Sequence, residues 1–490
     1  MEEQQSNTQE AMPLFSGLLA YAASRPLQFH IPGHKQGAGM APEFREFLGS
    51  NALSIDLVNV PPVDDLHRPR GMIKEAQALA AEAFGADHTF FSVQGTSGAI
   101  MAMILACVRP GEKILIPRNV HRAVMTGIVL SGAVPVFMTP EIDTEFGVAH
   151  GVSVSTVRRA LGEHPDARAL LVVNPTYFGV VSDLRAIVEV AHERDVPVLV
   201  DEAHGAHLYF HPSLPLSAMA AGADVAATSM HKLGGSLTQS SVLNVRAGLV
   251  NPQRIQAVLS MLTTTSTSYL LLASLDAARK QLATRGCEML DGVIALAEWA
   301  RDEINAIPGL CCLGRQHVGS LSSSYGYDPT KLFISVKGLG LSGPEVEQLL
   351  RVKYRIEIEM SDLYNILALI TLADNDSTVK RLVQALREIA EGVAVRRPRL
   401  VHVRLPDLPR LALTPREAFY RNSEAVLLAD SAGRIAAEFV MVYPPGIPLL
   451  LPGELIEQKN LDYIVEHIKA GLPVQGPEDV SLQTIRVVAD

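Results

Sequence analysis

Two segments about thirty residues apart contain the side chains best suited to chemistry. They are VDEAHGAH (200–207) and TSMHKLGGSLTQ (228–239), and in each an ionisable residue follows an apolar run. Such residues are predicted at strand ends, where open α/β sheets bind ligands. Pyridoxal-phosphate chemistry needs a lysine that forms an imine and a carboxylate that faces the pyridine nitrogen. Lys232 and Asp201 fit these two roles and predict this cofactor.

The charges of the two groups explain why these residue types are needed. A buried carboxylate beside the ring nitrogen keeps that nitrogen protonated, because a nearby opposite charge favours the charged form. The protonated ring then withdraws the electron pair left when a bond to the substrate α-carbon breaks. Removal from water lowers the pKa of a lysine amine, so an enclosed site suits the role expected of Lys232.

Small polar residues near Lys232 and further upstream predict a phosphate site. In SVQGTSGAI (92–100) a strand is expected to turn into a helix, and the free N–H groups of a helix N-terminus bind anions. The expected cofactor-phosphate residues are Gly95, Thr96, Ser97, Ser229 and His231.

His121, in IPRNVHRAV (116–124), begins another strand-to-helix connection, where an aromatic ring could stack on the pyridine face. Taken singly, each of these features also has a structural explanation, as a helix cap, a surface pair or a core histidine. The D-E-A-H run could also be a metal pair or a helicase-like box, but no G-x-x-x-x-G-K-[ST] loop precedes it. The order and spacing of the whole set favour the cofactor site.

An alternating βα pattern must position these groups. Apolar runs at 113–117, 135–138, 169–174 and 196–200 predict strands, and the last two read as buried on both faces. Helical stretches at 121–131 and 183–193 lie between them. This alternation predicts an α/β fold with a mostly parallel sheet and helices on both faces.

The pattern changes after about residue 250. Residues 251–286 predict one or two helices interrupted by a Thr/Ser patch at 263–268, and the helical region continues to about residue 306. An α+β region follows, with strands KLFISV, RIEIEMS and ILALITL and helices at 343–352 and 376–391. The predicted domains are an N-terminal segment 1–60, a cofactor-binding large domain 61–300, a small α+β domain 301–397 and a C-terminal subdomain 398–490, with prolines near 398–415 at the last boundary.

Composition limits the class of protein. The 490 residues carry a net charge of -10, from 52 acidic and 42 basic side chains, and no Lys/Arg stripe suggests nucleic-acid binding. The four cysteines form no C-x-x-C pair, which argues against a disulfide framework or a metal site. No signal-like N-terminus and no run of about 18–20 apolar residues is present. We therefore expect a cytoplasmic, soluble protein without membrane or nucleic-acid partners.

The motifs together resemble the fold-type I Orn/Lys/Arg decarboxylase family, and within it the short form typified by bacillus-type biosynthetic arginine decarboxylases. The likeness covers nearly the whole chain. The segments that carry it are FHIPGHKQGAG (29–39), DDLHRPRG (64–71), FFSVQGTSGAI (90–100), RNVHRAV (118–124), NPTYFGV (174–180), VDEAHGAH, SMHKLGGSLTQSS, TTTSTSYLLLASLD (263–276), TPREAF (414–419) and YPPGIPLLLPGE (443–454).

The resemblance implies an aspartate aminotransferase-like large domain with pyridoxal 5'-phosphate, followed by a C-terminal α+β domain. It implies that Lys232 forms the Schiff base, that Asp201 faces the pyridine nitrogen and that His121 stacks on the ring. It places Thr96, Ser97, Ser229 and His231 around the phosphate, with His204 close to the cofactor. His204 or Lys232 is also the expected proton donor to the α-carbon.

The resemblance also implies a homodimer or higher homo-oligomer with active sites at the subunit interface. The Thr/Ser patch at 263–268 would then reach the neighbouring subunit's cofactor, unless it is only the polar start of a helix. His30, His34 and Lys35 would line the pocket or belong to an arm that contacts the partner.

The implied activity is decarboxylation of L-arginine to agmatine and CO2, which feeds putrescine and spermidine biosynthesis. A guanidinium needs a carboxylate partner, and the candidates are Asp64, Asp65, Glu359, Asp362 and Glu438, each of which could instead be structural.

Other activities remain open. The nearest alternative is decarboxylation of lysine or ornithine, giving cadaverine or putrescine. Transamination or β-elimination is a further alternative. Aminotransferases usually carry a distinctive arginine for the α-carboxylate in the small domain, and the sequence shows no such signature, although Arg351 or Arg355 could mimic one. A silent regulatory relative is disfavoured because Lys232 and Asp201 are retained.

Overall fold

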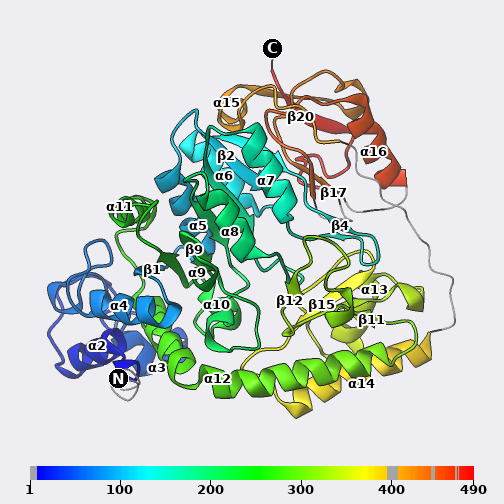
Figure 1. Cartoon of the computed structure of the whole chain (residues 1–490). Helices are drawn as coiled ribbons and strands as arrows, with labels where there is room; N and C mark the ends of the chain where they lie inside the picture. Colours follow the sequence, from blue (N-terminus) through cyan, green and yellow to red (C-terminus); the bar gives the residue numbers. More distant parts are fainter. Residues whose placement is uncertain (1–7, 394–406, 443–446, 470–471, 473, 490) are drawn as a thin grey trace. The chain divides into compact units, whose positions relative to one another are not determined.

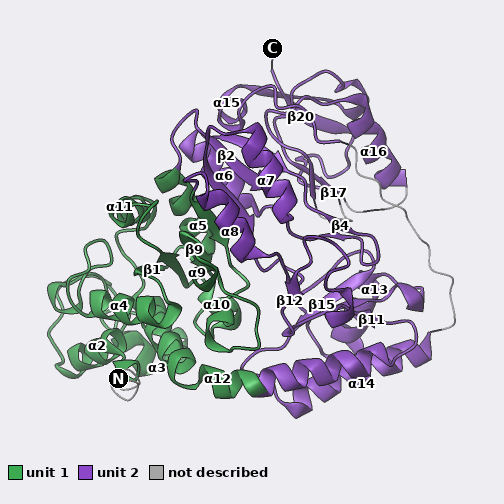
Figure 2. Cartoon of the chain, viewed as in Figure 1, with its two compact units in different colours: residues 1–107, 197–291 green, residues 108–196, 292–490 purple. Residues whose placement is uncertain are grey.

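The computed structural model describes residues 8–393, 407–442, 447–469, 472 and 474–489. The chain divides into two compact units, unit 1 with residues 1–107 and 197–291 and unit 2 with residues 108–196 and 292–490 (Figure 2). The long helix α12 (Tyr269–Asn305), green in Figure 1, contains the change from unit 1 to unit 2. The four predicted domains remain a prediction, and their boundary at 397 lies outside the described residues.

Four strands of unit 1 lie in the order β1-β10-β9-β8. Strands β8 and β9 are parallel, whereas β10 pairs antiparallel with both β9 and β1. In the parallel pair Asp201 lies opposite Ala227, so the carboxyl ends of β8 and β9 are neighbours. The bounds are β1 His88–Ser92, β8 Val198–Asp201, β9 Val225–Thr228 and β10 Ser241–Val245.

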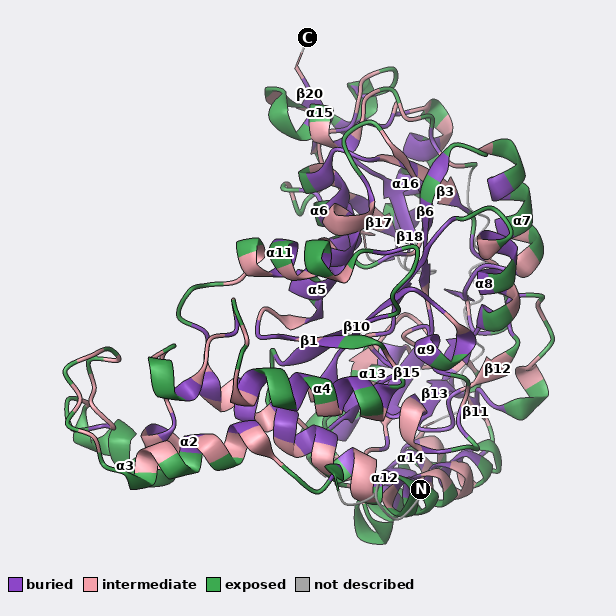
Figure 3. Ribbon diagram, turned by 60° about the vertical axis from the view of Figure 1, so that its left-hand side comes forward, coloured by how far each residue is buried: buried purple, intermediate pink, exposed green. Residues whose placement is uncertain are grey.

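The helices of unit 1 include α5, which packs against β8, β9 and β10 with most of its residues buried. The sequence of α5 is apolar over most of its length, and an uninterrupted apolar run is typical of a helix that is covered on most sides. In contrast, α3 is largely exposed, as Figure 3 shows. The bounds are α2 Pro13–Ala23, α3 Pro42–Ser54, α4 Met72–Phe84, α5 Gly95–Cys107, α9 Ala218–Ala221, α10 Met230–Leu233 and α11 Pro252–Leu262, with 3-10 turns at Pro61–Val63 and Leu208–Phe210.

Unit 2 begins with three parallel strands in the order β6-β2-β3. Helices α6, α7 and α8 alternate with these strands along the chain, and α7 and α8 start at the side-chain caps Ser153 and Asp183. The bounds are β2 Lys113–Pro117, α6 Arg122–Ser131, β3 Val134–Met138, β4 Ile142–Asp143, β5 Val148–Ala149, α7 Val154–Glu163, β6 Ala167–Val173, β7 Val180–Val181 and α8 Leu184–His192.

The rest of unit 2 holds smaller antiparallel sheets, in the orders β11-β13-β15-β14, β18-β17-β19 and β16-β20, and a ladder of β12 with β7. A separate apolar core, from Leu428 to Val487, lies beneath the C-terminal strands and α16. The bounds are β11 Cys311–Cys312, β12 Gly326–Tyr327, β13 Lys331–Ser335, α13 Gly343–Leu349, β14 Met360–Ser361, β15 Asn365–Leu369, α14 Asp376–Gly392, α15 Pro415–Tyr420, β16 Ser423–Leu427, β17 Val440–Val442, β18 Ile447–Leu450, α16 Gln458–Lys469, β19 Val474–Gln475 and β20 Thr484–Val488, with 3-10 turns at Arg315–His317, Lys337–Leu339 and Leu428–Asp430 and a π turn at Leu350–Tyr354.

One predicted strand is much shorter than expected. RIEIEMS (355–361) alternates apolar and polar residues, but only Met360–Ser361 forms β14. Arg355 has a φ of 54°, a left-handed conformation that ends the preceding π turn instead of extending the chain. Alternation alone therefore overestimated this strand.

Two other predicted elements end early, because ILALITL forms β15 only to Leu369 and the helix predicted at 343–352 gives way to a π turn after Leu349. Most of the other predicted elements agree with the structure. The four apolar runs from 113–117 to 196–200 correspond to β2, β3, β6 and β8, and the Thr/Ser patch separates α11 from α12. Three of the strand pairs within the units, β2–β3, β2–β6 and β8–β9, are parallel. In the described part of the chain, no helix combines the length and apolar character needed to span a bilayer.

Candidate functional site

Lys232 lies in the short helix α10, which directly follows strand β9. Its Nζ is 2.7 Å from Nε2 of His204, a buried histidine three residues beyond the end of β8. At this distance a proton lies between the two nitrogens, and each can donate to or accept from the other. The structure thus brings together two residues that were predicted to act at the same centre.

Asp201 is the last residue of β8 and is only 4% exposed. Its Oδ1 accepts a hydrogen bond from the backbone N–H of Ala203 at 3.2 Å. Because β8 and β9 are parallel neighbours, Asp201 and Lys232 come from adjacent strand ends of unit 1. This is the edge at which the sequence placed the ligand site.

Three hydroxyl groups gather near the N-terminus of α5. Thr96 Oγ1 is hydrogen-bonded to Ser229 Oγ and, at 2.7 Å, to Ser241 Oγ. The helix starts at Gly95 with a φ of 67°, a left-handed conformation that glycine adopts without steric cost. Ser97, in the first turn, is exposed. Hydroxyls at a helix N-terminus suit an anionic phosphate.

His231 and His121 make local contacts of their own. Nδ1 of His231 donates to the carbonyl of Ser240 at 3.0 Å. His121 belongs to unit 2, where it caps α6 and its Nδ1 accepts from the backbone N–H of Ala123 at 3.2 Å. Stacking of His121 on a cofactor ring remains a prediction.

The side chains of unit 1 fit pyridoxal phosphate. The cofactor needs an amine for its aldehyde, a carboxylate for its ring nitrogen and hydrogen-bond donors for its phosphate. Lys232, the buried Asp201 and the hydroxyls of Thr96 and Ser229 offer these three kinds of group within one unit.

Asp64, a predicted substrate residue, is bonded to the backbone around it. Its carboxylate accepts N–H groups from Asp65, Arg70, Gly71 and Ile73 at 2.8 to 3.3 Å. Burial raises the pKa of this carboxyl, but the four backbone bonds outweigh burial and hold the pKa below its usual value. These contacts favour a structural role at the start of α4, which begins at Met72.

We expect Asp64→Asn to lower the free energy of unfolding at neutral pH by about 1–2 kcal/mol, because a weaker acceptor replaces a helix-capping carboxylate. The depressed pKa means that the stabilisation by Asp64 is present above its unfolded pKa and is lost as the pH falls through its folded pKa. Urea unfolding from neutral pH to below 3.8 should therefore show the two proteins converging in acid. Glu82→Gln, on the exposed side of α4, is the control; an equal loss in both variants would contradict the capping role.

The other predicted substrate acids also have local partners. Asp65 accepts from the N–H of His67, and Glu438 accepts backbone N–H groups from Glu478 and Arg486. The remaining two behave differently from each other: Asp362 holds the turn to Asn365 through three hydrogen-bond donors, whereas Glu359 is exposed and accepts from the hydroxyl of Tyr177. Glu359 is the exposed one of the five, and its substrate role stays a prediction.

Glu202, next to Asp201, was not singled out from the sequence. It is fully buried and accepts hydrogen bonds from the hydroxyls of Tyr209 and Thr228 and from the N–H of Ala218. Burial raises the pKa of Glu202 to about 8, so its carboxyl is largely protonated at neutral pH. The only feature of the sequence that could have drawn attention to Glu202 is its place directly after Asp201, the predicted cofactor aspartate.

The residues of the predicted arm and the Thr/Ser patch lie in unit 1 and make contacts within it. His34 Nε2 is 3.1 Å from Asp56, and Lys35 donates to the carbonyl of His30. His67, in the DDLHRPRG motif, joins α11 to the patch, because its ring bonds Ser260 Oγ at 2.7 Å and the carbonyl of Thr264 at 2.9 Å.

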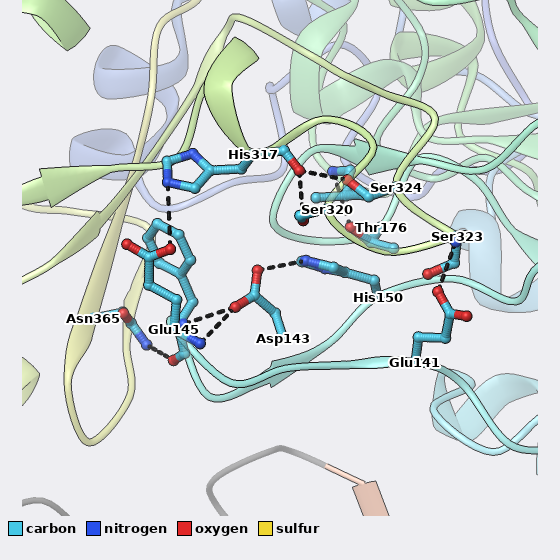
Figure 4. A network of polar contacts seen from close by, with 12 residues as sticks. Glu141, Asp143, Glu145, His150, Thr176, His317, Ser320, Ser323, Ser324 and Asn365 are labelled. Carbon is cyan, nitrogen blue, oxygen red and sulfur yellow. Dashed lines mark hydrogen bonds and ion pairs between the residues drawn. The ribbon is translucent and has the colours of Figure 1, made fainter.

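A second polar cluster lies in unit 2 around the β4–β5 hairpin (Figure 4). There Glu145, Cys311 and His317 are close enough together for a metal ion. However, Nδ1 of His317 accepts the N–H of Gly314 at 3.0 Å, so the neutral ring carries its proton on Nε2, the nitrogen that faces the other two. A metal-binding histidine usually donates from its other ring nitrogen, so the geometry favours a hydrogen-bonded network over a metal site.

Comparison with known proteins identifies the family. The family models described as "Orn/Lys/Arg decarboxylase, major domain" and "Orn/Lys/Arg decarboxylase, C-terminal domain" match residues 12–378 and 399–473. The chain is 61% identical over 485 residues to arginine decarboxylase of Bacillus subtilis, covering 99% of both chains. It is also 61% identical over 486 residues to arginine decarboxylase of Halalkalibacterium halodurans, covering 98% of both.

The fold agrees with these matches. The constitutive lysine decarboxylase of E. coli superposes with a TM-score of 0.84 at 21% identity, over 98% of this chain and 82% of that chain. This likeness and the family match confirm the predicted fold class, a pyridoxal-phosphate fold-type I architecture followed by a C-terminal domain. The chain belongs to the Orn/Lys/Arg decarboxylase family and is a pyridoxal-phosphate-dependent decarboxylase.

Proposed function

We propose that this chain removes the α-carboxylate of L-arginine, giving agmatine and CO2 for putrescine and spermidine synthesis. The observation that carries the proposal is 61% identity, over 99% of both chains, to an arginine decarboxylase. The pairing of Lys232 with His204 and the buried Asp201 support the same chemistry.

Bound pyridoxal phosphate supplies the electron sink that takes up the electron pair released when the carboxylate leaves as CO2. Lys232 would bond to the cofactor aldehyde, and Asp201 would keep the ring nitrogen protonated. The phosphate would be held by the N-terminus of α5 together with Thr96, Ser97, Ser229 and His231. The family resemblance implies that His121 would stack on the ring.

The proton returned to the product's α-carbon comes from the Lys232–His204 pair. The 2.7 Å contact between Nζ and Nε2 lets either nitrogen resupply the other, so the pair works as one proton reservoir. Either residue of the pair can therefore be the final donor to the α-carbon.

The substrate assignment predicts a preference among basic amino acids. A planar guanidinium binds a carboxylate through two parallel hydrogen bonds, which an ammonium group cannot do. We expect kcat/KM for arginine to exceed the values for lysine and ornithine by roughly tenfold or more. CO2 release with product identification for all three amino acids measures this, and a preference for lysine or ornithine would overturn the assignment.

The active form is a homodimer or a larger homo-oligomer, in which the patch at 263–268 reaches the neighbouring subunit's cofactor. In support, the N-terminal segment of the single chain leaves Leu27, Phe29 and Phe47 more than 80% exposed. Apolar side chains gathered in one exposed segment usually mark a protein interface. Sedimentation analysis should give a mass of at least two chains, and a stable active monomer would refute the proposal. The cytoplasmic location also stays a prediction from the sequence.

A further inference from the structure

Arg118 connects the segment before His121 to the C-terminal part of the chain. It follows β2 directly and is fully buried, with Glu454 as an equally buried partner. Two guanidinium nitrogens bond the two carboxylate oxygens, at 2.5 Å from Nη1 to Oε1 and 2.8 Å from Nη2 to Oε2. This is the paired fork geometry that fixes both distance and orientation.

The remaining donors of Arg118 reach the same C-terminal segment. Nε donates to the carbonyl of Pro448 at 2.8 Å, and Nη2 donates to the carbonyl of Leu449 at 3.2 Å. Glu454 in turn accepts the N–H of Leu451 at 2.8 Å. One arginine side chain therefore binds both strand β18 and the loop after it, across more than 300 residues of sequence.

The backbone of the Arg118 segment is held on its other side as well. The N–H of Arg118 donates to the carbonyl of Met138, and Asn119 Nδ2 donates to the carbonyl of His150 at 2.9 Å. His150 is itself fixed by Asp143, with 3.1 Å between Nε2 and Oδ2 (Figure 4). Only Val120 separates this anchored pair from His121, the cap of α6.

A buried ion pair is a costly way to stabilise a fold. Removal of both charges from water costs several kcal/mol per ion, and well-packed apolar side chains often stabilise as well or better. In addition, the two parallel hydrogen bonds of the fork fix the position of the backbone that carries Arg118. That backbone leads directly to His121.

We propose that the Arg118–Glu454 pair is a positioning device, through which the C-terminal segment fixes the backbone that carries His121 at the start of α6. The inference rests on the proposed role of His121. It makes the C-terminal segment part of the site's construction, and Arg118 and Glu454 positioning residues.

The test compares Glu454→Gln with Asp328→Asn. Asp328 pairs with Lys331 at 3.1 Å, and both residues are also fully buried in unit 2, at the start of β13. Each substitution removes one carboxylate charge from a buried pair and keeps the side-chain size. Hydrogen exchange of the peptide 117–125 in cofactor-free protein, the dissociation constant for pyridoxal phosphate and thermal stability are measured for both.

In Glu454→Gln we expect the exchange rate at 117–125 and the cofactor dissociation constant each to rise by about tenfold. Loss of one hydrogen bond to a charged group changes an equilibrium constant by about that factor. Asp328→Asn should leave both near wild type even where it lowers thermal stability. If Glu454→Gln does not fold, Arg118→Lys replaces it, since lysine keeps the charge but loses the fork.

Unchanged exchange at 117–125, or an equal rise in Asp328→Asn, overturns the inference. Borohydride reduction of the wild-type holoenzyme distinguishes failure of the positioning role from failure of the proposed function. If the reduced cofactor is found on the Lys232 peptide but exchange is unchanged in Glu454→Gln, only the positioning role is refuted. If no reduced cofactor is found on that peptide, the proposed function is refuted.

Discussion

Replacing Lys232 with alanine is expected to abolish covalent cofactor binding and to lower kcat by roughly 10³-fold or more, as loss of a covalent catalytic group does in other enzymes. In the proposed function this amine would bond the cofactor aldehyde, and the substitution also removes the nitrogen that lies 2.7 Å from Nε2 of His204. Borohydride reduction followed by peptide mass analysis measures the covalent bond, and CO2 release measures activity.

Two further variants make the Lys232 experiment decisive. Lys232→Arg keeps the positive charge but cannot form the imine, so it should be as inactive as the alanine variant. Lys74→Ala removes an exposed lysine from α4 and should match wild type. An active Lys232→Arg enzyme, or a reduced cofactor found on another peptide, would refute the assignment.

Asp201→Asn is expected to retain the cofactor on Lys232 but to lower kcat by about 10²–10³-fold, the range found when one preorganised electrostatic partner is removed. The neutral amide no longer favours a protonated ring nitrogen, so the ring withdraws electrons less strongly. Steady-state kinetics give kcat, and borohydride labelling shows whether the cofactor is still attached to Lys232.

The neighbouring acid provides the matched control for Asp201. Glu202 is equally buried, but its pKa of about 8 leaves it largely protonated at neutral pH, so Glu202→Gln removes almost no charge. The glutamine amide can bond the hydroxyls of Tyr209 and Thr228, which accept as well as donate. Near-wild-type activity is expected, and equal losses in both variants would mean that burial, rather than the charge of Asp201, is what matters.

The proposed chemical centre could be predicted from the sequence because each of its groups lies in a short motif after a predicted strand. Strand β8 ends at Asp201, and Lys232 follows β9, which pairs with β8 in parallel. A periodic pattern shows where strands end, and parallel strands bring those ends to one edge. The same reasoning failed for 355–361, where a left-handed residue interrupts an alternating pattern.

The roles of the other carboxylates could not be predicted in this way. Asp64, Asp362 and Glu202 look alike in the sequence as acids beside motifs. In the structure, backbone N–H groups hold the first two and burial keeps the third protonated. Hydrogen-bond partners and desolvation depend on where the chain packs, and no local pattern records them.

The sequence by itself determined the fold class, the cofactor chemistry and Lys232 and Asp201 as its expected centre, because local motifs and periodicity carry that information. Only the tertiary structure decided that Lys232 meets His204, that Asp64 caps a helix and that Arg118 binds Glu454 more than 300 positions away. Two of these contacts join residues far apart in the sequence, whereas the contacts of Asp64 span up to nine residues. Their energies come from burial and from geometry that exists only once the chain has folded.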